Sequence, residues 1–163
     1  MEALTGKILH REARANLAVP AAATVAQPRY ELIEALFFAY RDFVGDADRL
    51  LIGYGFGRAH HRVLHFVHRH PGLSIAALLE ILRITKQSLN RVLKNLVEQD
   101  FIEVRAGASD RRQRHLHATP AGHDLAERLA EVQTGRFERA LAQLSPQGQS
   151  EAMRFLDAMR DQT

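Results

Sequence analysis

The chain has 163 residues, of which 46% are hydrophobic, enough for one domain with a core and an additional assembly element. The absence of cysteine excludes a disulfide scaffold, a thiolate metal site and a thiol-based redox switch. The apolar runs are too short to span a membrane, and the N-terminus lacks the basic-then-apolar layout of a secretory signal, so we expect a cytoplasmic protein.

The charge of the chain is unevenly distributed. Its formal net charge is +3, but the window from Arg83 to Arg114 holds eight basic and four acidic residues, which leaves the remainder slightly acidic. A basic patch on a nearly neutral protein is typical of nucleic-acid binding.

The first third of the chain predicts an N-terminal segment and a linker, followed by a long apolar helix. Residues 1–18 could form a short helix, and 18–28, with two prolines among small residues, predict a linker. A helix is expected over 29–44, and because it is apolar over more than half its surface it should be buried on two sides. Residues 45–57 are punctuated by glycine and predict a connection with one turn of helix over 48–52.

The rest of the chain predicts a helix–turn–helix, a two-stranded wing and two terminal helices. The expected elements are helices over 58–70, 74–82 and 84–100, strands over 101–107 and 114–119, a long helix over 120–143 and a last helix that begins at Pro146. Ser74, Thr85 and Ser145 are the expected N-caps. The wing must pack against helices, because an isolated hairpin is not stable in water. The fold class is therefore mostly α, a winged helix–turn–helix.

The helix in "ITKQSLNRVLKNLVEQD", residues 84–100, has an unusual polar face. Its apolar stripe contains Leu89, Val92, Leu93, Leu96 and Val97, and no acid occurs before Glu98. Amide side chains can pair with adenine and basic ones with guanine, whereas carboxylates are disfavoured beside phosphates. The expected DNA-reading residues are Thr85, Lys86, Gln87, Ser88, Asn90, Arg91 and Lys94.

The predicted tip of the wing is rich in arginine. The segment "SDRRQR" supplies Asp110, Arg111, Arg112 and Arg114, and arginine is attracted to the negative potential of a narrow minor groove. An acid at such a tip makes sense as a brace that fixes the pose of one arginine. Further phosphate contacts are expected from Arg58, Arg62 or Arg83.

These motifs resemble the multiple-antibiotic-resistance regulator (MarR) family of winged-helix regulators. The resemblance is carried by "ITKQSLNRVLKNLVEQDFIE", by the wing tip in the family's D-x-R pattern, and by "LHATPAG", which is similar to the family's L-T-x-x-G at the start of the long helix. Element order extends it over 29–160. The stretches "FFAYRDF" and "YGFGRAHHRVLHFV" also resemble a proteobacterial, PetP-type branch of the family.

The resemblance implies a homodimer that binds double-stranded DNA at a palindromic operator, commonly as a repressor. By motif match, Asp110 would brace Arg112, and Arg112 would enter the minor groove. The implied division is an N-terminal segment at 1–28, a dimerisation helix and connection at 29–57, a DNA-binding domain at 58–119 and C-terminal dimerisation helices at 120–163. Two apolar stripes of the last two helices suit the interface: Leu125, Leu129, Val132, Phe137, Leu141 and Leu144, and then Met153, Phe155, Leu156 and Met159.

An effector pocket is expected between the dimerisation and DNA-binding parts, because the family often binds small phenolic effectors there. Its expected lining is Phe37, Tyr40, His65 and Phe66, although the aromatic residues alone favour a role in the dimer core or in intradomain packing over a pocket. No cofactor is expected.

Two other functions stay open at this point. His61, His65 and His68 share one side of a helix and could hold a metal or haem iron, or could simply be polar positions. A winged helix used only for contact with other proteins would not need the arginine-rich wing. An enzyme is not expected, since there is no glycine-rich phosphate loop or cysteine nucleophile, and "HDLAE" (123–127) has an acid and a base without metalloprotease spacing.

Overall fold

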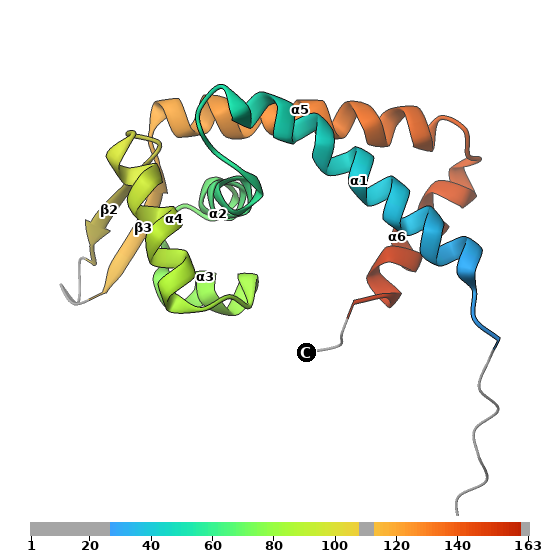
Figure 1. The fold of residues 1–163 in the computed structure, drawn as a ribbon, viewed down its shortest axis with the longest axis horizontal. Helices are drawn as coiled ribbons and strands as arrows, with labels where there is room; N and C mark the ends of the chain where they lie inside the picture. The colour runs from blue at the N-terminus through green and yellow to red at the C-terminus, as the bar shows by residue number, and fades with distance from the viewer. Residues whose placement is uncertain (1–26, 108–112, 161–163) are drawn as a thin grey trace, which may run out of the picture.

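The computed structural model describes residues 27–107 and 113–160. The elements are α1 (Tyr30–Ile52), α2 (Arg58–Arg69), β1 (Leu73–Ser74), α3 (Ile75–Leu82), α4 (Lys86–Glu98), β2 (Ile102–Ala106), β3 (Arg114–Ala118), α5 (Pro120–Leu141) and α6 (Pro146–Ala158). Figure 1 shows α1 and α5 running side by side, with α2–α4 and the sheet gathered at one end of α5 and α6 at the other. The predicted mostly helical, winged helix–turn–helix fold is confirmed.

Helix α1 is longer than the sequence predicted. It runs without interruption for 23 residues, so the connection expected from residue 45 is wrong. The buried positions Val44, Ala47 and Leu51 continue the helical spacing across Gly45 and face α5 and the core. Their burial outweighs the cost of about 1 kcal/mol that one glycine imposes on a helix interior.

An ion pair fixes α1 against α5. The Asp46 carboxylate accepts a hydrogen bond from Nε of Arg136 at 2.8 Å, and Arg49 on α1 pairs with the same carboxylate. Phe43 packs on Phe137 beside it, with ring centroids 5.2 Å apart. The two helices are thus joined by polar and aromatic contacts on neighbouring turns.

The core lies under the helix–turn–helix, with α2 at its centre. Val63, Leu64 and Val67 of α2 are buried, and they pack with the apolar faces of α3, α4, α5 and the sheet. The expected caps are confirmed: Ser74 accepts from the Ala77 amide, Thr85 from the Ser88 amide and Ser145 from the Gly148 amide.

The wing belongs to a three-stranded antiparallel sheet rather than the expected two-stranded hairpin. The strand order is β1-β3-β2, with Leu73 opposite Leu116 and Val104 opposite Leu116 on the other side. Strand β1 has only two residues, too few to leave an alternating pattern in the sequence. Leu116 and Ile102 are fully buried, which confirms that the wing packs on the helices.

Thr119 joins the sheet to α5. It caps α5 by accepting from the Gly122 amide at 3.0 Å, and its hydroxyl donates to the Asp100 carbonyl at 2.6 Å. The side chain is buried, so both bonds are shielded from water. The "LHATPAG" motif therefore sets the direction in which α5 leaves the sheet.

The apolar stripe predicted for α5 is buried in its first part and exposed in its second part. Leu125 and Leu129 are buried in the core under the helix–turn–helix, so they are not interface residues as the sequence suggested. Val132, Phe137 and Leu144 stay exposed further along the chain. The helices in the described ranges include none with the length and apolarity needed to cross a membrane.

Candidate nucleic-acid interface

Helix α4 buries one face and exposes the other. Leu89, Val92, Leu93 and Leu96 are buried, whereas Val97, expected in the same stripe, is 38% exposed near the end of the helix. Every polar residue predicted to meet DNA on this helix is exposed: Thr85, Lys86, Gln87, Ser88, Asn90, Arg91 and Lys94. The structure thus presents one continuous polar surface without an acid until Glu98, which pairs with Lys94 at 3.6 Å.

The turn before α4 is tightly built. Arg83 ends α3 in the left-handed conformation, with φ of 49°, and its amide donates to the Leu79 carbonyl. The Thr85 hydroxyl accepts from the Ser88 amide at 3.2 Å and donates to the Ser88 hydroxyl at 3.0 Å. These two side chains are held together at the positive end of the α4 dipole, a position that favours a phosphate.

Helix α2 braces the helix–turn–helix from behind. His60 stacks on Phe56, its Nδ1 accepts from the Gly57 amide at 3.1 Å, and its Nε2 lies 3.4 Å from the Asn95 amide nitrogen on α4. Burial lowers the pKa of His60 and so favours the neutral ring, whose Nδ1 can accept the hydrogen bond from Gly57. Arg62 donates to the Leu82 carbonyl at 3.3 Å and so ties α2 to the end of α3.

The base of the wing is anchored to the body of the protein. Nδ1 of His115 donates to the Gly72 carbonyl at 2.7 Å, which links β3 to the turn after α2. The His115 side chain is half-buried in this bond. Arg105 pairs with Glu103 on its own strand, and Arg114 is exposed where β3 begins. Asp110, Arg111 and Arg112, the predicted tip, lie outside the described residues.

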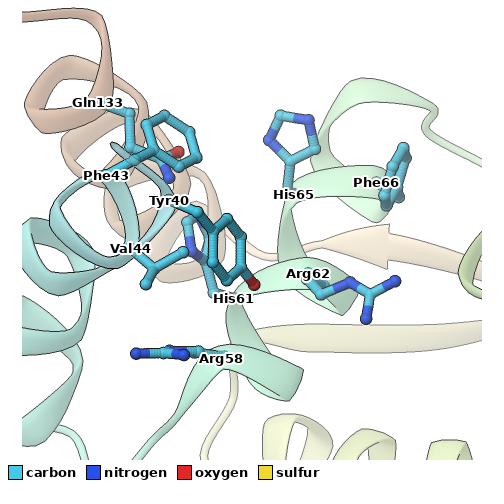
Figure 2. A pocket seen from close by; sticks show the side chains of 9 residues that line it. All are labelled: Tyr40, Phe43, Val44, Arg58, His61, Arg62, His65, Phe66 and Gln133. Carbon is cyan, nitrogen blue, oxygen red and sulfur yellow. The ribbon is translucent and has the colours of Figure 1, made fainter. Parts of the chain in front are cut away.

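A pocket of about 550 Å³ lies between α1, α2 and α5. Its lining consists of Tyr40, Phe43, Val44, Arg58, His61, Arg62, His65, Phe66 and Gln133 (Figure 2). Three of the four residues predicted for an effector pocket line it, namely Tyr40, His65 and Phe66. Phe37 does not line it and is 65% exposed on α1.

The pocket combines an aromatic wall with cationic groups. Burial lowers the pKa of both His61 and His65, so their rings are neutral at pH 7 and the positive charge comes from Arg58 and Arg62. Arg58 is partly compensated by Asp48, whose carboxylate accepts from its Nε at 2.9 Å. Such a lining suits a small aromatic molecule that carries a negative charge.

The structure does not gather the histidine stripe into one site. His61 and His65 face the pocket, with ring centroids 6.4 Å apart, whereas His68 turns toward α5 and packs edge-on against His123 at 4.4 Å. The three histidines do lie on one side of α2, as their i, i+4, i+7 spacing predicted. That side faces the pocket beside α1 at His61 and His65 but faces α5 at His68, so the three rings do not meet.

Sequence reasoning missed the bracing residues, because their roles depend on partners far along the chain. His60 reaches Asn95 and His115 reaches Gly72, and neither pair has a spacing that marks it. The sequence does indicate that His123 and Glu127 are neighbours, because residues four positions apart lie on one face of a helix. Their neighbour His68 could not be identified from that spacing.

Comparison with known proteins agrees with this geometry. A sequence profile of the MarR family matches residues 54–113. HTH-type transcriptional regulator PetP of Rhodobacter capsulatus is 46% identical over 129 residues, 79% of this chain and 78% of that protein. The crystal structure of Streptococcus pneumoniae FabT in complex with DNA matches with a TM-score of 0.69 and 17% identity over 82% of this chain and 100% of that chain. The S. aureus MepR–DNA complex matches with a TM-score of 0.65 and 19% identity, covering 81% and 96%.

The two structural matches, at low identity, speak for the shared fold. The PetP match covers most of both proteins at an identity close to one half. The chain therefore belongs to the MarR family and is a transcriptional regulator of the PetP type rather than an enzyme.

Proposed function

We propose that the protein binds double-stranded DNA with sequence specificity, as a homodimer on a palindromic operator. The observation that carries the proposal is the exposed, acid-free face from Thr85 to Lys94 on a helix whose other side is buried. A second helix presented in this way can lie in the major groove. The wing residues Asp110, Arg111, Arg112 and Arg114 are proposed to contact the adjacent minor groove. FabT and MepR, which share the fold, have been solved with DNA.

The exposed apolar surface of the terminal helices supports the homodimer. On α1 it includes Leu32, Ile33 and Leu36, which form an apolar groove with Phe155 of α6 and Met159 at the C-terminal end of that helix. A monomer gains nothing by presenting so much apolar surface to water, whereas a partner would bury it. Two copies would also supply two recognition helices for two half-sites about one helical turn apart.

The same placement supports a functional division of the chain. We assign DNA binding to 58–119 and dimerisation to 29–57 together with 120–163, and we leave 1–28 as a preceding segment. Leu125 and Leu129 of α5 pack in the core of the DNA-binding part. The boundary at residue 120 therefore separates two proposed functions, although one hydrophobic core extends across it. A regulator of this kind acts where the chromosome lies, and we expect it in the cytoplasm.

We propose that the pocket between α1, α2 and α5 binds an effector that releases the DNA. Tyr40, His65 and Phe66 supply aromatic and imidazole surface, and Arg62 supplies charge. An occupant would touch both the dimerisation helix α1 and the DNA-binding helix α2, so it can change the spacing of the two recognition helices (Figure 2). We further propose that the DNA-bound protein acts as a repressor, so that binding of the effector would relieve repression.

Selection of bound duplexes from a random DNA pool tests the proposal directly. A palindromic winner, with affinity that falls steeply as salt rises, would support a dimeric DNA reader. No enrichment and weak binding at every salt concentration would favour the alternative of a winged helix that contacts only proteins. Sedimentation of the same preparation would establish whether the free protein is a dimer.

A further inference from the structure

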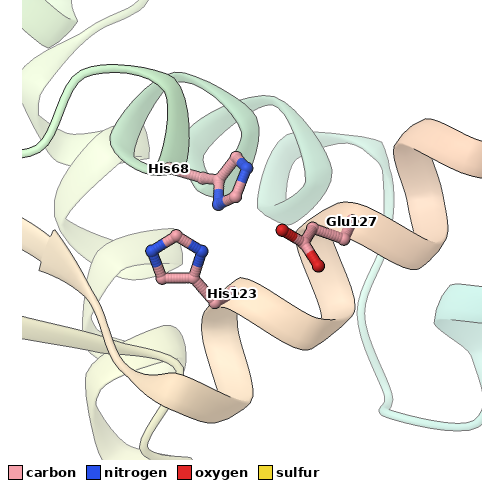
Figure 3. A group of neighbouring side chains, drawn as sticks. All are labelled: His68, His123 and Glu127. Atoms are coloured by element: carbon pink, nitrogen blue, oxygen red, sulfur yellow. The ribbon is translucent and has the colours of Figure 1, made fainter.

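A second group of side chains lies apart from the pocket and from α4. His68 of α2 and His123 and Glu127 of α5 point toward one another across the junction of the two helices (Figure 3). One ligand-type atom from each residue lies within 4.8 Å of the others. In the described part of the chain, no other set of three histidine or acidic side chains is brought this close.

His68 is the unusual member of this group. Its Nδ1 is buried and has no hydrogen-bond partner among the described residues, although buried polar atoms are almost always satisfied. Its ring packs edge-on against His123 instead of being hydrogen-bonded to it, with an interplanar angle of 76°. A purely structural histidine at this junction would be expected to have a donor or acceptor for that nitrogen.

The three residues match the ligand chemistry of one kind of ion. Imidazole nitrogen together with a carboxylate oxygen suits Zn²⁺ and similar first-row divalent ions. His123 and Glu127 are four residues apart on α5, about one helical turn, and both are exposed, so their side chains can rotate inward. Zinc bonds of about 2.0–2.2 Å place tetrahedral ligand atoms roughly 3.3–3.6 Å apart, so a closure of about 1.5 Å or less is needed.

We propose that His68, His123 and Glu127 form a binding site for Zn²⁺ that links α2 to the start of α5. The three residues leave the fourth tetrahedral position to water. The site uses neither the effector pocket nor the DNA-reading face, so it is independent of the function proposed above. Because its ligands come from two helices that pack in the same core, the bound ion would also hold these helices together.

The test uses the full chain without a polyhistidine tag, freed of metal by dialysis against EDTA. Co²⁺ is titrated first, since its visible absorption reports four-coordinate binding, and Zn²⁺ is then added to displace it. We expect one Co²⁺ per chain and a higher melting temperature with Zn²⁺. His123→Ala and Glu127→Gln should each weaken binding by at least about tenfold, the low end of what loss of even an outer-shell partner costs.

Two exposed positions provide matched controls. Glu131→Gln changes the carboxylate one turn further along α5, and His70→Ala removes a histidine just after α2. Both should bind the ion as the wild type does. Absence of saturable binding would overturn the proposal, and so would equal affinity in the site variants or equal loss in the controls. Melting without metal shows that each variant is folded, and DNA binding of the metal-free protein is measured separately.

Discussion

A Cβ atom placed on Gly122 would lie only 2.0 Å from the carbonyl oxygen of Phe101. The first turn of α5 therefore passes directly over the backbone where the chain leaves α4 for β2. The neighbouring Thr119 amide donates to the same carbonyl at 3.2 Å, so this oxygen cannot easily move away. The glycine of the "LHATPAG" motif is required by this contact between backbones.

Gly122→Ala should destabilise the fold by about 1–3 kcal/mol or more, because the methyl group forces α5 away from the sheet. Gly45→Ala is the matched control, since a Cβ there meets only the end of the Arg49 side chain at 3.9 Å. Removing a glycine from the interior of α1 should stabilise the protein by up to about 1 kcal/mol. Urea unfolding of the three proteins measures both effects, and a neutral Gly122→Ala would contradict the close contact.

Asn90→Ala should weaken binding to the selected operator by about 1–3 kcal/mol and leave the dependence on salt unchanged, if its amide reads a base. Lys94→Ala should instead lower the salt slope by about one, as expected for a phosphate contact. Gln99→Ala, exposed where α4 ends, should change neither quantity. Fluorescence anisotropy at several salt concentrations separates these outcomes, and a salt-dependent loss in Asn90→Ala would reassign that residue to the backbone.

Arg112→Ala tests the wing, whose tip the sequence alone predicts. We expect DNA binding to weaken by about 1–3 kcal/mol while the dimer stays intact in sedimentation. Arg112→Lys keeps the charge but loses the planar fork, so it should recover only part of the affinity. An affinity equal to that of the wild type in Arg112→Ala would remove the wing from the proposed interface.

Leu36→Glu tests the dimer surface on α1. A charge in the apolar groove with Phe155 should dissociate the dimer and lower operator affinity by on the order of tenfold or more, because the two half-sites are then bound separately. Ile52→Glu introduces the same charge at the exposed end of the same helix, outside that groove. Only Leu36→Glu should change the sedimentation of the protein.

The ion pair between α1 and α5 should make stability depend on pH. The hydrogen bond from Arg136 lowers the pKa of Asp46 below its ordinary value of 3.8. The pair therefore contributes fully above that value, and its contribution is lost as the pH falls through the lowered pKa. Asp46→Asn should melt earlier than the wild type at pH 7, and this difference should shrink in acid below pH 3.8. Asp124→Asn, at an exposed position on α5, should follow the wild type.

The elements that the sequence predicted best are those with local signals. Ser74, Thr85 and Ser145 each accept the amide three residues on, as their spacing before apolar periodic segments indicated. The polar face of α4 could also be predicted, because the spacing of the apolar residues determines which residues point outward. The aromatic side of the pocket followed from Tyr40 and Phe66.

The features that could not be predicted depend on distant contacts. Gly45 is a helix breaker by propensity, and only the burial of α1 against α5 and the core keeps the helix intact. Strand β1 forms because Leu73 meets Leu116, 43 residues later. Phe37 was assigned to the pocket, but its place on α1 leaves it exposed. His68 faces His123, and no spacing within α2 could indicate that neighbour.

The single helix α5 leads from the sheet to the surface proposed for dimerisation. Its 22 residues make it about 33 Å long, since each residue adds about 1.5 Å. A tilt of about 6° at one end of such a rod displaces the other end by about 3.4 Å, the rise of one base pair along DNA. An effector in the proposed pocket would therefore need to shift side-chain contacts near the pivot by only about a few tenths of an ångström to move a proposed half-site contact out of register.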